Sequence, residues 1–195
     1  MKYKLFAVII CTELFTVTLA LLISIFGNSV GIKLPEPTGL ILIFLLPIIF
    51  GSHVFEEFIF PGKFEEWYKN YHPEFANTTM SAYFFKINAI PLASSTFLTL
   101  GVFNYSGNFS FIGIRAWFAF LSILFVNMFF HIRGTLRLKK YSPGLITALV
   151  LYFPFTIFSS VYFLKTNTMD VLSVIVCFMV GLLFQPLVDH IKNQY

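Results

Sequence analysis

Charged residues are scarce in this chain. Of its 195 residues, 13 are Lys or Arg and nine are Asp or Glu, so only 11% carry a charge, against roughly 25% in a soluble domain. So few charges cannot cover a globule of 22.4 kDa with hydrated groups, which all but excludes a water-soluble enzyme. A disordered chain is excluded in the same way, because disorder needs low hydrophobicity.

Cysteines and basic clusters are also few. The two cysteines, Cys11 and Cys177, both fall in apolar stretches, so we interpret them as small buried side chains rather than a disulfide, and the redox compartment stays open. The formal net charge is +4, but no Lys/Arg-rich run carries interleaved aromatic residues. The sequence therefore predicts no nucleic-acid partner, and we expect the basic residues to meet lipid head groups.

Apolar residues are abundant. They make up 57% of the chain, with 27 Phe and a mean hydropathy of +0.81. A helix of roughly 20 apolar residues crosses a bilayer core about 30 Å thick. Six stretches are long enough, at about 5–26, 38–60, 81–104, 110–132, 144–165 and 169–191. The sequence predicts an all-α, polytopic membrane protein, a six-transmembrane-helix bundle that forms one domain over residues 1–195.

Basic residues are distributed unevenly among the segments that join these stretches. If the N-terminus is cytoplasmic, the outer segments carry only Lys33, Arg115 and Lys165. The inner segments then carry the other ten, Lys2, Lys4, Lys63, Lys69, Lys86, Arg133, Arg137, Lys139, Lys140 and Lys192. This positive-inside bias predicts that both termini are cytoplasmic. We expect a multi-pass protein of a bacterial inner membrane, with membrane lipids as its neighbours.

Polar residues inside the apolar stretches gather at one depth. An ionisable residue at the centre of a membrane helix costs about 2.5–3.5 kcal/mol, so each one needs a reason. The second, fourth and sixth stretches all run from outside to inside, and each has polar residues near its inner end. These are His53, Glu56 and Glu57, then Asn127 and His131, then Asp189 and His190.

Helical spacing brings these residues onto shared faces. His53, Glu56 and Glu57 stand at i, i+3 and i+4, and Asn127 and His131 at i and i+4. Two carboxylates facing lipid would repel each other and each lose its hydration. We therefore expect the Glu pair to face inward toward His131, where it could share protons or hold a cation.

Other polar positions allow two interpretations each. Helix ends near the interface often carry polar residues because water is close, and this suits Asp189 and His190. Glu13 lies inside the first stretch, either as a functional group or as the partner of a structural hydrogen bond to Asn88. The aromatic and charged segment 62–80 either anchors its rings in the head-group layer or forms a lid over a substrate.

Several blocks of the sequence carry a family resemblance. The motif His-x-x-Glu-Glu at 53–57, followed by Pro-Gly-Lys-Phe at 61–64 and by Trp67, resembles the HXXEE family of integral membrane proteins. Asn and His at 127 and 131, and Tyr-Ser-Pro-Gly at 141–144, are similar to other blocks of that family. The resemblance implies a membrane protein with a site at this motif, and it supplies no reaction.

The order of the acidic and imidazole residues is also similar to that of intramembrane proteases related to the prenyl-protein endopeptidase. Glu56, Glu57, His131 and His190 follow one another as expected there. The Arg expected shortly after the Glu pair is missing, and Gln194 stands where an Asn or Asp would follow His190. The likeness is one of geometry only, and it keeps a metal-dependent intramembrane hydrolase as an alternative.

The chemistry of these residues favours an enzyme. We expect acid–base chemistry on a lipid or isoprenoid-like substrate at the cytoplasmic interface, because carboxylates in different environments can serve as acid and base. The candidate catalytic residues are Glu56, Glu57, His53, His131 and Asn127, and the candidate substrate-binding residues are Glu13, Asn88, Trp67 and His190.

Three alternatives stay open at this point. Zinc or iron on His53, Glu57 and His131 fits the ligand types, but the grouping has no second copy like that of the di-iron bundles, so the sequence does not favour a metal. A proton-coupled transporter or a non-catalytic lipid-binding protein would use the same polar residues. The sequence leaves the oligomeric state open.

Overall fold

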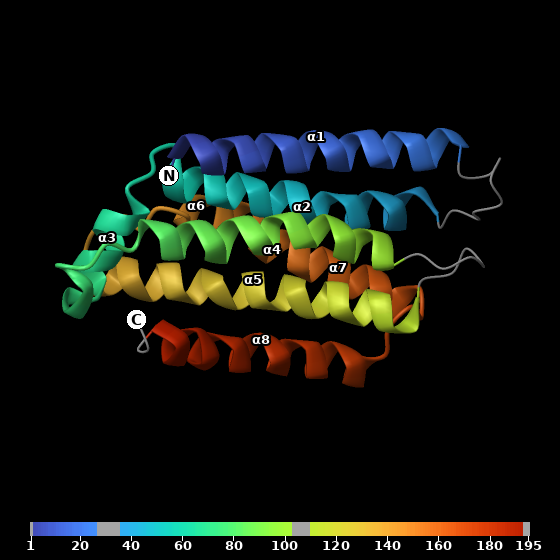
Figure 1. Cartoon of the computed structure of the whole chain (residues 1–195). Helices are drawn as coiled ribbons and strands as arrows, with labels where there is room; N and C mark the ends of the chain where they lie inside the picture. Colours follow the sequence, from blue (N-terminus) through green and yellow to red (C-terminus); the bar gives the residue numbers. More distant parts are fainter. Residues whose placement is uncertain (1, 27–35, 103–109, 193–195) are drawn as a thin grey trace.

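The protein is a bundle of long helices that lie side by side (Figure 1). The computed structural model describes residues 2–26, 36–102 and 110–192, except for the side chains of Ser24, Leu100 and residues 185–192. The long helices in these ranges are α1 (Lys2–Phe26), α2 (Pro37–Phe58), α4 (Ser81–Gly101), α5 (Phe111–Leu138), α7 (Phe153–Lys165) and α8 (Val171–Lys192). The described residues contain no strand, so the all-helical prediction is confirmed.

Short helical elements gather at one end of the bundle. Between α2 and α4 lie α3 (Phe64–Tyr71) and the 3-10 turn η2 (Pro73–Phe75). A turn after α5 leads into α6 (Leu145–Thr147) and the π-helical segment η3 (Ala148–Tyr152), which continues directly into α7. The N- and C-terminal ends of the chain lie at this same end as α3 (Figure 1).

Helix α5 is longer than the apolar stretch that predicted it. The stretch ends at about 132, but the helix continues to Leu138 and stops at Lys139, whose φ of 50° is left-handed. Polar residues such as Arg and Thr sustain a helix as long as no breaker follows, so apolarity alone underestimates its length. Asn127 and His131 therefore lie about three and two turns before the end of α5, further inside the helix than the apolar stretch predicted.

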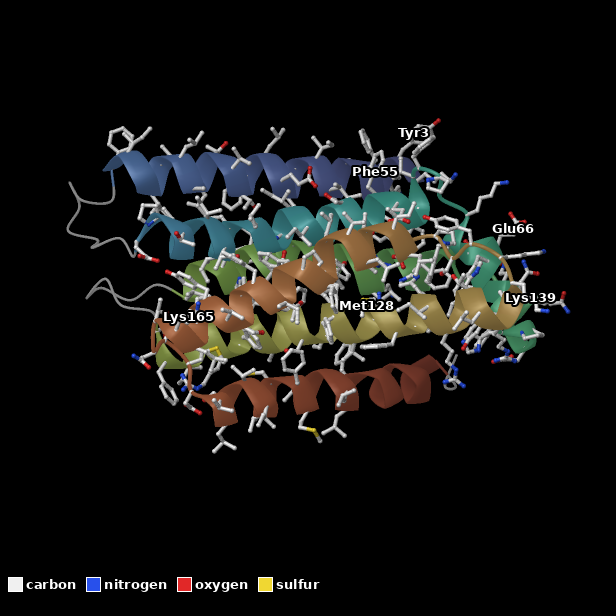
Figure 2. All side chains as sticks on the ribbon, turned by 180° about the vertical axis from the view of Figure 1, so that it is seen from behind. Tyr3, Phe55, Glu66, Met128, Lys139 and Lys165 are labelled. Atoms are coloured by element: carbon white, nitrogen blue, oxygen red, sulfur yellow. The ribbon has the colours of Figure 1, made fainter. Side chains whose placement is uncertain are left out.

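The surface of the bundle is suited to lipid. In the part of the chain that the structure describes, four helices are long and apolar enough to cross a membrane, namely Lys2–Ile23, Pro37–Phe58, Phe111–Leu138 and Leu145–Lys165. Bulky apolar side chains are exposed along the outside, as at Leu14, Phe97 and Ile175. In Figure 2 the middle of the bundle carries mainly carbon atoms, with Glu66 and Lys139 at one end and Lys165 at the other. The protein thus has the features of a membrane protein.

Helix α3 packs its aromatic rings into the protein. Phe64, Trp67, Tyr68 and Tyr71 are all buried, and the Trp67 ring lies over Gly134 of α5, where even a Cβ atom would collide with it. Neighbouring rings meet edge to face or stacked at centroid distances typical of aromatic pairs. Of the two interpretations of this segment, rings anchored in the head-group layer do not fit these four residues, because their rings are buried in the protein and cover the end of the bundle.

A carboxylate on α3 makes this packing sensitive to acid. Glu65 accepts hydrogen bonds from Ser81 at the start of α4 (2.7 Å) and from Lys69 (3.2 Å). Burial alone would raise the pKa of Glu65, but these bonds outweigh it and hold the pKa below its ordinary 4.5. A carboxyl with a lowered pKa stabilises the fold above its ordinary pKa, and this stabilisation is lost as the pH falls through the folded value.

We expect α3 to loosen when the pH falls below about 4, with a change in tryptophan fluorescence from Trp67. In Glu65→Gln the bonds are weakened at every pH, so the acid-dependent part of the change should shrink. The measurement is a fluorescence titration of both proteins in detergent. Identical titration curves for the two proteins would contradict this role of Glu65.

Candidate functional site

Two histidines and a glutamate from neighbouring helices meet inside the bundle. His53 and Glu57 come from α2 and His131 from α5, and all three are at most 4% exposed. The Glu57 Oε1 atom lies 3.4 Å from His53 Nε2 and 3.4 Å from His131 Nε2. The three ligand atoms lie within 4.8 Å of one another, and the two imidazole rings meet edge to face at 5.0 Å between centroids. The helical spacing of 53 and 57 brings the α2 pair together.

Hydroxyl groups hold the far side of both imidazoles. His53 Nδ1 lies 2.9 Å from Thr147 Oγ1, and His131 Nδ1 lies 2.9 Å from Ser142 Oγ. The Thr147 hydroxyl is also placed to donate to the Gly144 carbonyl at 3.2 Å, and in that arrangement it accepts from His53 Nδ1–H. In this tautomer the neutral His53 ring carries its lone pair on Nε2, the atom that faces Glu57 and the Asn127 amide.

Asn127 closes the fourth side of this group. Its Nδ2 atom lies 3.3 Å from His53 Nε2 and 3.2 Å from His131 Nε2. The amide can donate one hydrogen to each ring, or present its oxygen at the same place after a flip, because the two ends of an amide have the same shape. We call His53, Glu57, Asn127 and His131 the central cluster.

The turn before α6 fits tightly against the central cluster. Gly144 has a φ of 98°, and a Cβ atom on it would lie 2.7 Å from His131 Cε1, 2.8 Å from His53 Cε1 and 2.9 Å from Glu57 Cγ. Only glycine suits both this conformation and this contact. The backbone of the turn is thus one wall of the cluster.

The neighbouring carboxylate, Glu56, has different partners. It accepts hydrogen bonds from the backbone N–H groups of Ile146 (3.0 Å) and Thr147 (2.7 Å) and from the Tyr141 hydroxyl. The first N–H groups of a helix have no partner inside that helix, and an anion is favourable beside them. Glu56 therefore caps the α6–η3–α7 helix from another helix, and the two adjacent glutamates do not form a pair.

Aromatic rings cover the cluster on its remaining sides. Tyr152, in the π-helical segment, lies 4.6 Å from His53 between ring centroids, and Trp67 stacks over His131 at 6.3 Å. π-helical turns within α-helices occur frequently at functional sites. Trp67 thus contacts a histidine of the cluster from the α3 side, and its predicted role in substrate binding stays a prediction.

A groove of about 510 Å³ lies beside the cluster, between α1, the end of α2 and α6. Its apolar lining includes Phe6, Ile9 and Phe55, and its polar lining is Glu13, Ser52, Glu56, Tyr141 and Thr147. Thr147 also contacts His53, so one residue separates the groove from the cluster.

The chain matches a known protein family. Residues 44–159 match the profile of the family described as "Protein of unknown function with HXXEE motif". This chain belongs to the HXXEE family. The match begins inside α2, covers α3, α4 and α5 in full and ends half-way through α7, so it includes every residue of the central cluster and the turn at Gly144. Searches among curated proteins and among solved structures give no match.

The other predicted site residues of this HXXEE protein have separate places. Glu13 lines the groove beside Gly51. Asn88 is buried and donates to the Phe84 carbonyl of its own helix rather than to Glu13. The side chains of Asp189 and His190 lie outside the described residues, although their backbone belongs to α8. The structure thus brings together the five candidate catalytic positions around α6, with Glu56 on a different side from the rest.

Four contributors were missed as site residues: Ser142, Gly144, Thr147 and Tyr152. Ser142 and Gly144 belong to the Tyr-Ser-Pro-Gly block that carries the HXXEE resemblance, which signals a constrained turn and gives no role to either residue. Thr147 and Tyr152 stand in an apolar stretch with no motif of their own. Hydroxyl and aromatic residues are common in membrane helices, so only the fold selects these two.

Proposed function

We propose that this HXXEE protein is a membrane-embedded enzyme that acts on a lipid or isoprenoid-like substrate, with the central cluster as its reactive centre. The observation that carries the proposal is a fully buried carboxylate, Glu57, in contact with two imidazoles inside a lipid-facing bundle. A buried ionisable group in a membrane segment is costly, and such groups mark functional sites.

The geometry assigns each residue a task in proton transfer. His53 is held by Thr147 with its lone pair on Nε2, so it can accept a proton there. The Glu57 carboxylate beside it would stabilise the resulting imidazolium, as a carboxylate does for a catalytic histidine in other enzymes. His131 is available as the second acid or base, and the Asn127 amide lies within hydrogen-bonding distance of both rings and helps to fix their orientation.

The groove suggests the substrate class. Its apolar side chains from α1 and α2 would accommodate an acyl or isoprenoid chain, and Glu13, Glu56 and Tyr141 add polar groups to the same lining. Acceptors of this kind suit a head group with hydroxyl or amine hydrogens. In this proposal the chain crosses the membrane six times with both termini in the cytoplasm, which places the groove at the cytoplasmic side.

The test is the loss of Glu57. In cells that produce Glu57→Gln at the same membrane level as the unchanged protein, we expect the conversion of an affected lipid to fall by about 10²–10⁴-fold, the usual contribution of a general acid or base. Mass spectrometry of total lipid extracts measures the change. Glu66→Gln is the matched control, because Glu66 is exposed on α3. If the lipids of cells with the unchanged protein and with Glu57→Gln are the same, the proposed enzyme is refuted.

A further inference from the structure

We infer that the central cluster is a binding site for one divalent transition-metal ion, of the class of zinc or iron(II). His53 Nε2, His131 Nε2 and Glu57 Oε1 would be its ligands. The use of this ion in catalysis rests on the proposed function, whereas the binding itself does not.

The spacing of the ligand atoms is that of a coordination shell. Ligands about 2.1 Å from a zinc ion, in tetrahedral geometry, lie about 3.4 Å from one another. Glu57 Oε1 lies 3.4 Å from both imidazole nitrogens, which are themselves at most 4.8 Å apart. Asn127 Nδ2 lies 3.3 and 3.2 Å from the same two nitrogens, and the amide oxygen takes this place after a flip. Two of the three edges between the proposed ligands thus have the expected length.

The charges also favour a cation at this place. When Nδ1–H of the neutral His53 ring is used for Thr147, Nε2 carries a lone pair. This lone pair faces a carboxylate oxygen at 3.4 Å in a site that excludes water. Two acceptors so close together repel each other unless a positive centre lies between them, and a carboxylate without one is very costly to bury. A metal ion satisfies Glu57 and both histidines at once.

The surroundings have the features of a metal site beyond its ligands. Metal-binding histidines usually donate their second N–H to an oxygen, which fixes the ring. Thr147 Oγ1 is placed to accept from His53 Nδ1–H, and Ser142 Oγ is placed to accept from His131 Nδ1–H. Gly144 packs against the Cε1 atoms of both rings and leaves them no room to turn. Two nitrogen ligands and one carboxylate favour zinc or iron over magnesium or calcium, which prefer oxygen alone.

Such an ion would give the cluster a specific chemistry. With three protein ligands, a zinc or iron ion keeps a position for water or for a substrate oxygen, and it lowers the pKa of that water. Asn127 would then either complete the shell through its oxygen or hydrogen-bond the group in the open position. This deepens the proposed function, since the proton acceptor would be a metal-bound hydroxide rather than His53.

The experiment measures metal in the full-length protein, purified in detergent without chelators. We expect about one equivalent of zinc or iron per chain by elemental mass spectrometry, and a large loss in His131→Gln. His72→Gln is the matched control, because His72 is a partly exposed residue that contacts only Glu74 and nearby rings, and it should keep the metal. In the metal-stripped unchanged protein, Co²⁺ should give the visible absorption bands of tetrahedral cobalt.

A second variant separates a metal site from a purely structural network. Thr147→Val keeps the backbone bond to Glu56 and removes the hydroxyl behind His53, so it should weaken Co²⁺ binding by about 10–100-fold. The inference is overturned if the unchanged protein neither retains metal nor gives the cobalt bands, or if His131→Gln binds as much as the unchanged protein. A metal-free protein in which Glu57→Gln still abolishes lipid conversion would refute the metal and keep the enzyme. A protein that binds the metal but converts no lipid would refute the enzyme and keep the metal site.

Discussion

Gly144→Ala should destabilise the protein strongly and disorganise the central cluster. A residue with a side chain at a φ of 98° carries a backbone cost of about 1–2 kcal/mol. Its Cβ would also press on His131, His53 and Glu57, whose positions are fixed by their own hydrogen bonds, and overpacking of this kind adds about 1–3 kcal/mol. The sum, about 2–5 kcal/mol, is a large part of the stability of a typical domain.

Thermal unfolding in detergent, followed by circular dichroism at one scan rate, measures this effect. Gly101→Ala is the matched control, because Gly101 lies at the end of α4 with open space around its missing Cβ. It should leave the midpoint unchanged or raise it slightly, since alanine is the better helix former. Equal midpoints for Gly144→Ala and the unchanged protein would show that the turn is not packed against the cluster.

Glu56→Gln should also be severe, although it changes one atom. Glu56 uses both oxygens, Oε1 for Tyr141 and Ile146 and Oε2 for Thr147. Glutamine has one acceptor oxygen, so its NH₂ group must face a backbone N–H and leave that group without a partner. A buried donor that loses its acceptor costs about 1–3 kcal/mol, and the lost favourable charge at the helix start adds about 0.3–1 kcal/mol.

The comparison with Tyr141→Phe tests this explanation. That variant removes one donor and keeps the carboxylate and both backbone bonds, so it should cost only about 0.5–1.5 kcal/mol. Unfolding midpoints of the two variants are the measurement. A destabilisation by Tyr141→Phe as large as that by Glu56→Gln would mean that the hydroxyl, not the cap of α6, is the main partner. Glu56→Gln should thus act mainly on stability, whereas Glu57→Gln should act mainly on activity.

The sequence predicted most of the fold because lipid-facing helices follow from one simple property. Runs of apolar residues located α1, α2, α4, the continuous α6–η3–α7 helix and α8 to within a few residues. Apolar runs do not predict the structure where polar residues continue a helix or where protein, rather than lipid, buries apolar side chains. Helix α5 continues through polar residues to Leu138, and the aromatic rings of α3 are buried by protein rather than by lipid.

The candidate site could be predicted in outline for a related reason. Charge inside a membrane segment is rare enough to be informative, so Glu57, His53 and His131 stood out, and helical spacing placed them on inward faces. The separation of Glu56 from Glu57 could not be foreseen, because it depends on where the backbone of residues 146 and 147 lies. Partners of this kind are backbone groups, which every residue has and no motif records.

The order of the chain has a consequence for biosynthesis. His53 and Glu56 belong to α2, but the hydroxyls and backbone amides that bind them belong to residues 141–147. During translation, the Glu56 carboxylate therefore lacks these partners until 85 to 91 further residues have been synthesised. We expect a nascent chain that ends before residue 146 to hold α2 with this carboxylate uncapped.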